Sequence, residues 1–307
     1  MEAGVPAAGE GRAADDTAGG GVAGPWDQDE LLRLMDVRRT GPGRYTAPAH
    51  GPSARNVVEA GQLVAGAVVA ASKEIPGQRV TSATMIFSRA AGHDEEIVFE
   101  LDVPHAGRTY STVSARAVQA GRQRAAGLIL MGADAEDLVA STAPMPDVPP
   151  PSGAPPLGMP EMLVGGREIR VVDGAYDFDP QRVGPPELHV WTRFDRTPPE
   201  AYLNAALMTQ STTHWTIASA LRPHAGYSEA MAHKTISTGI SKVTVSFHAD
   251  VDVGQWLLYS NQVVYTGRGM TQGEGRVYGE DGRLAASYAV QGMIRPLTVG
   301  SVSGTTL

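Results

Sequence analysis

Two ionisable side chains stand where they could do acid–base chemistry. Glu59 lies near the start of a long apolar segment, and His214 lies within a second one. A carboxylate buried beside apolar surface usually needs a reason, because burying it alone is costly. Imidazole is the side chain poised to exchange a proton near neutral pH. Each residue also has a structural interpretation: Glu59 could interact favourably with a helix dipole, and His214 could hydrogen-bond within an interface between repeats.

Two further polar residues, Ser241 and Gln291, lie in segments that we expect to be strands. Ser241 precedes Lys242, and a lysine beside a serine can activate the hydroxyl as a nucleophile. Successive strand residues point to opposite faces, which argues against such a pair here. The chain has no cysteine, which excludes thiolate nucleophiles, thiolate metal ligands and disulfides. His224 and His248 have no partner at metal-ligand spacing, so we expect no metal and no cofactor.

These residues fall in two stretches with the same order of elements. Residues 56–131 begin with an apolar helix, for which Asn56 is a suitable cap, and continue with four segments of alternating polarity. Residues 199–295 repeat that order. Gly-Arg pairs recur at matching turns, namely Gly107-Arg108 and Gly121-Arg122 in the first stretch and Gly267-Arg268 and Gly282-Arg283 in the second. The duplication predicts an α+β double hot-dog fold, in which two helices are each wrapped by an antiparallel sheet.

Composition suggests how the chain is divided. We expect a disordered tail at 1–27, an N-terminal hot-dog domain at 28–140, a proline-rich linker at 141–160 and a C-terminal hot-dog domain at 161–307. The tail has no basic segment followed by an apolar one, so it is no secretory signal. The longest apolar run is too short to span a bilayer. With 25 basic against 33 acidic residues, we expect no nucleic acid as a partner, and we expect no membrane partner either. The absence of cysteine leaves a cytoplasmic location as the expectation.

Several segments carry a resemblance to a known family. They are AGQLVAGAVVAA (60–71), GRTYSTVSARAVQAGR (107–122), ALRPH (220–224), SFH (246–248), QWLLYS (255–260), GRG (267–269), DGRLAAS (281–287) and GMIR (292–295). In this order they span roughly Val57 to Leu297, and the chain resembles the type II acyl-CoA thioesterases, which carry two fused hot-dog domains. The resemblance implies a site in which an Asp, a Thr or Ser, and a Gln hold and activate water, with no metal.

This sequence departs from that pattern at all three positions. The Asp position of the second helix falls on Thr213, the Thr or Ser position of the next strand on Ile240, and the Gln position of the last strand on Val290. A threonine hydroxyl cannot take a proton from water near neutral pH, and losing a positioned base typically costs about 100- to 10,000-fold in rate. The next residue is polar in each case, but using it on a strand would require a bulge or a register slip.

The candidate catalytic residues are therefore Thr213, His214, Ser241, Gln291 and Glu59. A helix carboxylate serves as base or nucleophile in other hot-dog thioesterases, so Glu59 could mark a site relocated to the first domain. The resemblance implies hydrolysis of an acyl-CoA or acyl-carrier thioester, with coenzyme A present only as part of the substrate, and a possible homo-oligomer. Two alternatives stay open: an acyl-thioester-binding protein that no longer hydrolyses, and a hot-dog enzyme recruited to another acyl or polyketide reaction.

Overall fold

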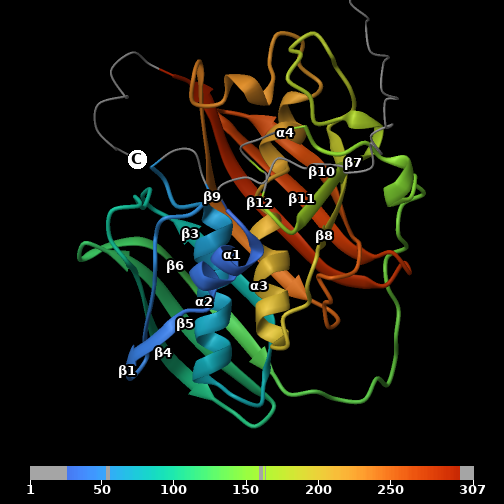
Figure 1. Ribbon diagram of the computed structural model, residues 1–307. Helices are drawn as coiled ribbons and strands as arrows, with labels where there is room; N and C mark the ends of the chain where they lie inside the picture. Colours follow the sequence, from blue (N-terminus) through green and yellow to red (C-terminus); the bar gives the residue numbers. More distant parts are fainter. Residues whose placement is uncertain (1–25, 53–55, 159–161, 163, 298–307) are drawn as a thin grey trace, which may run out of the picture.

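One curved antiparallel sheet and two central helices form the body of the protein (Figure 1). The computed structural model describes residues 26–52, 56–158, 162 and 164–297. Most of the predicted tail, residues 1–25, lies outside the described residues, whereas Asp27 caps the first helix. The sheet has 12 strands in the order β1-β2-β4-β5-β6-β3-β9-β12-β11-β10-β8-β7. The α+β double hot-dog prediction is confirmed.

Both repeats have the predicted order of elements. The first consists of α2 (Ala60–Glu74), β3 (Arg79–Phe87), β4 (Ile97–Ala106), β5 (Tyr110–Gln119) and β6 (Arg122–Gly132). The second consists of α3 (Ala201–Ser211), α4 (Thr216–Leu221), β9 (Ile236–Phe247), β10 (Leu257–Gly267), β11 (Met270–Gly279) and β12 (Leu284–Pro296). Strand β3 pairs with β9, which joins the two halves into one sheet.

The remaining elements extend this frame. They are α1 (Gln28–Met35), β1 (Arg38–Gly41), β2 (Arg44–Ala47), β7 (Arg167–Val171) and β8 (Glu187–Phe194). Helix α1 lies across α2 and α3, on the side away from the sheet (Figure 1). Strands β7 and β8 form the far edge of the sheet, and the repeat pattern gave no indication of them.

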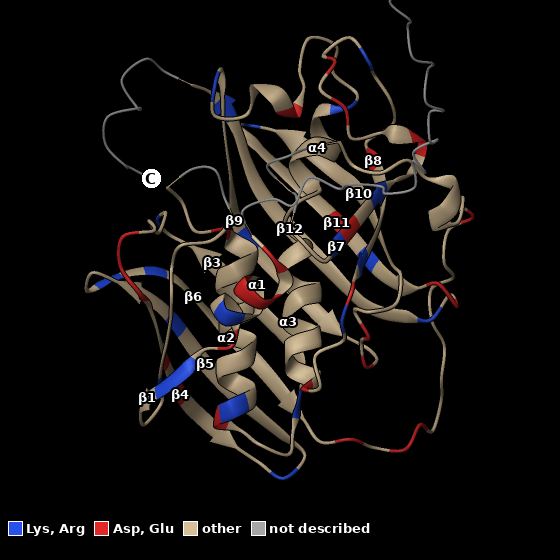
Figure 2. Cartoon of the chain, in the orientation of Figure 1, with Lys and Arg blue, Asp and Glu red and all other residues tan. Residues whose placement is uncertain are grey.

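Helix α2 is apolar all round because protein covers every side of it. Residues 61–71 are all buried, and charges are almost absent from the packed lengths of α2 and α3 (Figure 2). The helix begins later than its sequence suggests. Asn56 does not cap it, since its Oδ1 accepts a hydrogen bond from the amide of His93 at 2.6 Å. Glu59 is the N-cap instead, with extended backbone, and its side chain makes no capping bond.

The second central helix is broken where the sequence suggested a single one. The hydroxyls of Thr209 and Thr212 donate to the carbonyls of Ala205 and Thr209, both at 2.7 Å. Such local bonds compete with helical backbone bonding. Helix α3 ends at Ser211 and α4 begins at Thr216, so a short non-helical segment at residues 212–215 faces the start of α2.

The proline-rich linker lies against the outer surface of the second half of the sheet. Apart from a 3-10 turn at Pro151–Gly153 and an isolated bridge at Pro156, its described residues form no regular element. The indole of Trp191 donates to the carbonyl of Pro149 at 3.0 Å, and the hydroxyl of Tyr278 donates to the carbonyl of Pro144 at 2.9 Å. These contacts fasten the linker as a strap across β8 and β11.

Candidate active site

The start of α2 meets the end of α3 at a glycine. A Cβ added to Gly61 would lie 2.2 Å from the backbone oxygen of Gln210 and 2.8 Å from Oγ1 of Thr213. Only a residue without a side chain fits between two backbones at this distance. The contact brings Glu59, from the first repeat, against the last turn of the second repeat's helix.

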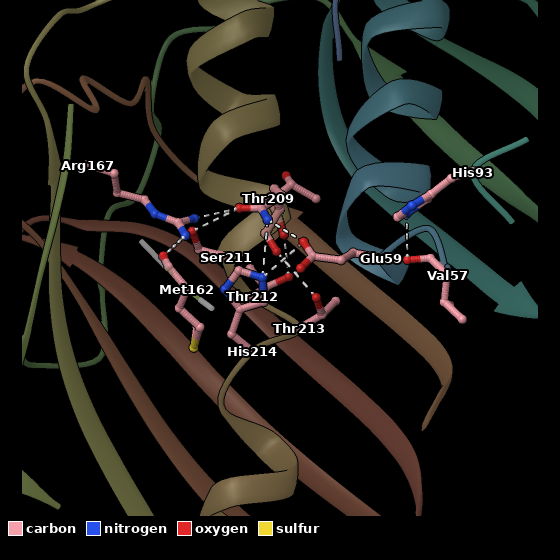
Figure 3. A network of polar contacts seen from close by, with 11 residues as sticks. Val57, Glu59, His93, Met162, Arg167, Thr209, Ser211, Thr212, Thr213 and His214 are labelled. Atoms are coloured by element: carbon pink, nitrogen blue, oxygen red, sulfur yellow. Dashed lines mark hydrogen bonds and ion pairs between the residues drawn. The ribbon is translucent and has the colours of Figure 1, made fainter. Parts of the chain in front are cut away.

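Glu59 and His214 meet across this contact (Figure 3). Nε2 of His214 lies 3.5 Å from Oε2 of Glu59, and the two side chains are 10% and 27% exposed respectively. Because Glu59 makes no capping bond, its carboxylate is free to reach toward α3. Two residues that the sequence offered separately therefore form one carboxylate–imidazole pair.

Gln210 completes the polar contacts of Glu59. Its Nε2 donates to Oε2 of Glu59 at 2.7 Å and lies 3.2 Å from Nε2 of His214. The guanidinium of Arg167, from β7, donates to Oε1 of Gln210 at 3.2 Å and to the carbonyl of Met162 at 2.6 Å. Sequence reasoning missed both residues. Gln210 stands four residues before His214, a spacing that would place them on one face of a continuous helix, but Arg167 had no comparable signal.

The pKa of Glu59 is lowered to about 2. Burial alone would raise it, but the hydrogen bond and charge of His214, the cation of Arg167 and the hydrogen bond from Gln210 together outweigh burial. The carboxylate therefore stays ionised throughout the neutral range.

Both halves of the chain match known sequence families. The model of the acyl-CoA thioesterase N-terminal domain matches residues 48–132, and the model of the acyl-CoA thioesterase C-terminal domain matches residues 135–294. The chain belongs to the acyl-CoA thioesterase family. No curated protein sequence matches it.

Solved structures of similar length share its fold. The tesB protein of Mycobacterium avium subspecies paratuberculosis is 19% identical, with a TM-score of 0.72 over 87% of this chain and 99% of that one. Acyl-CoA thioesterase II TesB2 of Mycobacterium marinum is 18% identical, with a TM-score of 0.71 over 87% and 99%. A hot-dog protein of Alicyclobacillus acidocaldarius is 20% identical, with a TM-score of 0.70 over 87% and 98%. The predicted resemblance is confirmed.

Of the three positions taken from the type II acyl-CoA thioesterase pattern, one lies beside the Glu59–His214 pair. Thr213 is buried, and its Oγ1 donates to the carbonyl of Gln210 at 3.3 Å. Ile240 packs against the apolar core, and Val290 is fully buried within it. A carboxylate of the first repeat thus lies next to the position where the pattern has a carboxylate in the second.

Ser241 and Gln291 lie apart from this network. The register of β9 and β12 shifts here, with Gln291 opposite Lys242 and Gly292 opposite Ile240, so Ser241 is the extra residue of a β-bulge. Its hydroxyl donates to the backbone carbonyl of Gln291 at 3.0 Å. The bulge that the sequence alternative would have required is present, but it ties Ser241 to β12. Among the described residues, the hydrogen bonds of Glu59, Gln210 and His214 do not involve Ser241 or Gln291.

The described residues contain no group of three His, Asp or Glu side chains placed to hold a metal ion. None of the helices among them is long and apolar enough to cross a membrane.

Proposed function

We propose that this chain hydrolyses acyl-CoA thioesters with a water molecule activated by the Glu59–His214 pair. The observation that carries the proposal is the meeting of an ionised carboxylate and a mostly buried imidazole at the junction of the two repeats, beside Thr213. Family membership supplies the substrate class, since both acyl-CoA thioesterase domain models match the chain.

The roles of the two residues follow from the strength of their contacts. Glu59 is ionised, and hydrogen bonds to charged acceptors are worth about 1.5–3 kcal/mol, against roughly 0.5–1.5 kcal/mol for neutral ones. The ring proton of neutral His214 is therefore best placed on Nε2, where it faces the carboxylate of Glu59 at 3.5 Å. The Gln210 amide then donates to Glu59 alone, because two N–H groups cannot hydrogen-bond each other. The proton on Nε2 leaves Nδ1 unprotonated. That atom is buried and has no hydrogen-bond partner among the described residues, so its lone pair is available as a base.

Hydrolysis then proceeds in two proton transfers. The oxygen of water bonds to the thioester carbonyl carbon while Nδ1 of His214 takes the proton of that water, and Glu59 stabilises the imidazolium that forms. The carbon–sulfur bond of the resulting intermediate breaks, and the departing sulfur receives the proton from His214. The products are a carboxylic acid and the free thiol, and the enzyme returns to its starting state.

The test is release of free thiol from acyl-CoAs of short to long chain. We expect turnover by the wild-type protein and a loss of about 100-fold or more in H214N, the usual worth of a general base. His248 provides the matched control, because it directly follows the end of β9 and its ring is hydrogen-bonded to the hydroxyl of Ser287. H248N should keep wild-type activity. Acyl-CoA binding by calorimetry without turnover at any chain length would contradict hydrolysis. It would favour an acyl-thioester-binding protein that no longer hydrolyses.

Carrier, location and assembly are finer parts of the same proposal. We infer coenzyme A rather than an acyl-carrier protein as the carrier because both matching domain models are those of acyl-CoA thioesterases. The absence of cysteine is compatible with a cytoplasmic protein. A homo-oligomer stays a prediction, and light scattering that gives the mass of a single 32.2 kDa chain would contradict it.

A further inference from the structure

Arg167 is a buried cation next to the site, on a strand that the hot-dog pattern does not include. It is 8% exposed and is the first residue of β7. Its two terminal nitrogens donate to Oε1 of Gln210 and to the carbonyl of Met162, as Figure 3 shows. A buried guanidinium without a counter-charge is costly, so this placement calls for a reason.

The first consequence of Arg167 concerns the orientation of the Gln210 amide. A guanidinium has only donors, so the amide must turn its oxygen toward Arg167. The hydroxyl of Ser211 is also directed at this oxygen, at 3.5 Å. The amide nitrogen is thereby turned to Glu59 and His214. If the amide were reversed, its oxygen would face the carboxylate, and both the bond to Arg167 and the bond to Glu59 would be lost.

The second consequence concerns charge. Burial lowers the pKa of Arg167, and the nearby carboxylate of Glu59 acts in the opposite direction. The titratable and charged groups around Glu59 are His214 from the segment between α3 and α4, Arg167 from β7 and His93 from the loop between β3 and β4. Among these described groups, Arg167 is the one that keeps its charge at every pH of interest. It therefore offsets the carboxylate even when His214 is neutral.

We propose that Arg167 is a positioning residue for the reaction: by fixing the Gln210 amide and supplying a permanent counter-charge, it holds Glu59 ionised and in place beside His214. The inference rests on the proposed function for its kinetic consequence. It does not depend on that function for its electrostatic consequence, because the titration of Glu59 is measurable in an inactive protein.

The kinetic experiment uses R167M, Q210M and the double variant, with R170M as the matched control. Arg170 is on the same strand, where it pairs with Glu168 away from the site. We expect R167M to lower kcat roughly 10-fold, the order expected for one hydrogen bond to a charged group, with KM nearly unchanged. In the Q210M background the same change should cost less than it does in the wild-type background, because the part of its effect that passes through Gln210 is already lost. If the losses of kcat caused by R167M and by Q210M multiply in the double variant, this part of the proposal is overturned.

The electrostatic experiment follows the Glu59 carboxyl by 13C NMR during an acid titration, with E59Q to assign the signal. Removing the cation in R167M should raise the pKa of Glu59 above its wild-type value of about 2. R167K keeps a charge at this position, so it should titrate closer to wild type, and it provides a folded variant if thermal unfolding shows R167M to be unstable. Identical Glu59 titrations in wild type and R167M would overturn the inference. If the wild-type protein does not hydrolyse acyl-CoA, the proposed function fails, while this titration still decides the role of Arg167.

Discussion

Replacing Gly61 with alanine should damage the site without touching any polar side chain in it. The added Cβ would lie 2.2 Å from the backbone oxygen of Gln210, more than 1 Å short of the ordinary contact distance of 3.4 Å. Because the nearest atom belongs to the backbone of α3, the two helices must move apart. A displacement of about 1 Å at a reacting centre can cost roughly 100-fold in rate.

Stability should change less than activity in G61A. Overpacking costs about 1–3 kcal/mol, whereas replacing a helical glycine with alanine returns up to about 1 kcal/mol. Thiol release and urea unfolding measure the two effects. The control is G239A, since a Cβ at Gly239 would have no neighbour within 4 Å. A G61A protein with wild-type kcat/KM would refute the reasoning that the spacing of α2 and α3 sets the geometry of the Glu59–His214 pair.

Two more predictions follow from individual contacts. The pKa of Glu59 in the folded protein, about 2, is below its ordinary value of 4.5, so ionised Glu59 adds stability that is present above pH 4.5 and is lost as pH falls toward 2. The stability difference between wild type and E59Q in urea unfolding should therefore shrink over that interval, and a difference that is constant with pH would count against the pairing. S241A should lower the free energy of unfolding by about 1 kcal/mol, for the lost bond to the Gln291 carbonyl, and leave kcat/KM within about two-fold. A ten-fold loss of kcat/KM would return Ser241 to the catalytic residues.

The repeat and most strand positions could be predicted from the sequence because they depend on local patterns. Glycine turns and alternating polarity located all four strands of each repeat. The edge strands β7 and β8 were not predicted, since they follow a proline-rich segment and lie outside the stretch that the sequence repeats. In the sheet, β1 and β2 occupy the equivalent edge of the first half. The break after Ser211 was also missed. It depends on threonine hydroxyls bonding to helix carbonyls, which composition alone does not reveal.

The candidate site was predictable only in part, for a geometric reason. Glu59 and His214 were each recognisable from residue type, but the sequence gave no reason to pair residues so far apart in the chain. Their meeting depends on Gly61, where two backbones approach closely. Arg167 was not predictable at all, because its role depends on tertiary contact with Gln210. The roles of Thr213, Ser241 and Gln291 stay predictions that the variants above address.

In the proposed mechanism, the first repeat supplies the carboxylate that the type II acyl-CoA thioesterase pattern places in the second. The most direct measurement is kcat/KM for thiol release by E59Q and T213A, compared side by side with wild type on the best acyl-CoA substrate. We expect E59Q to lose about 100-fold or more, the order of loss for removing a member of the acid–base machinery, and T213A to stay within a few-fold of wild type. A severe loss in T213A with E59Q nearly unchanged would contradict the account.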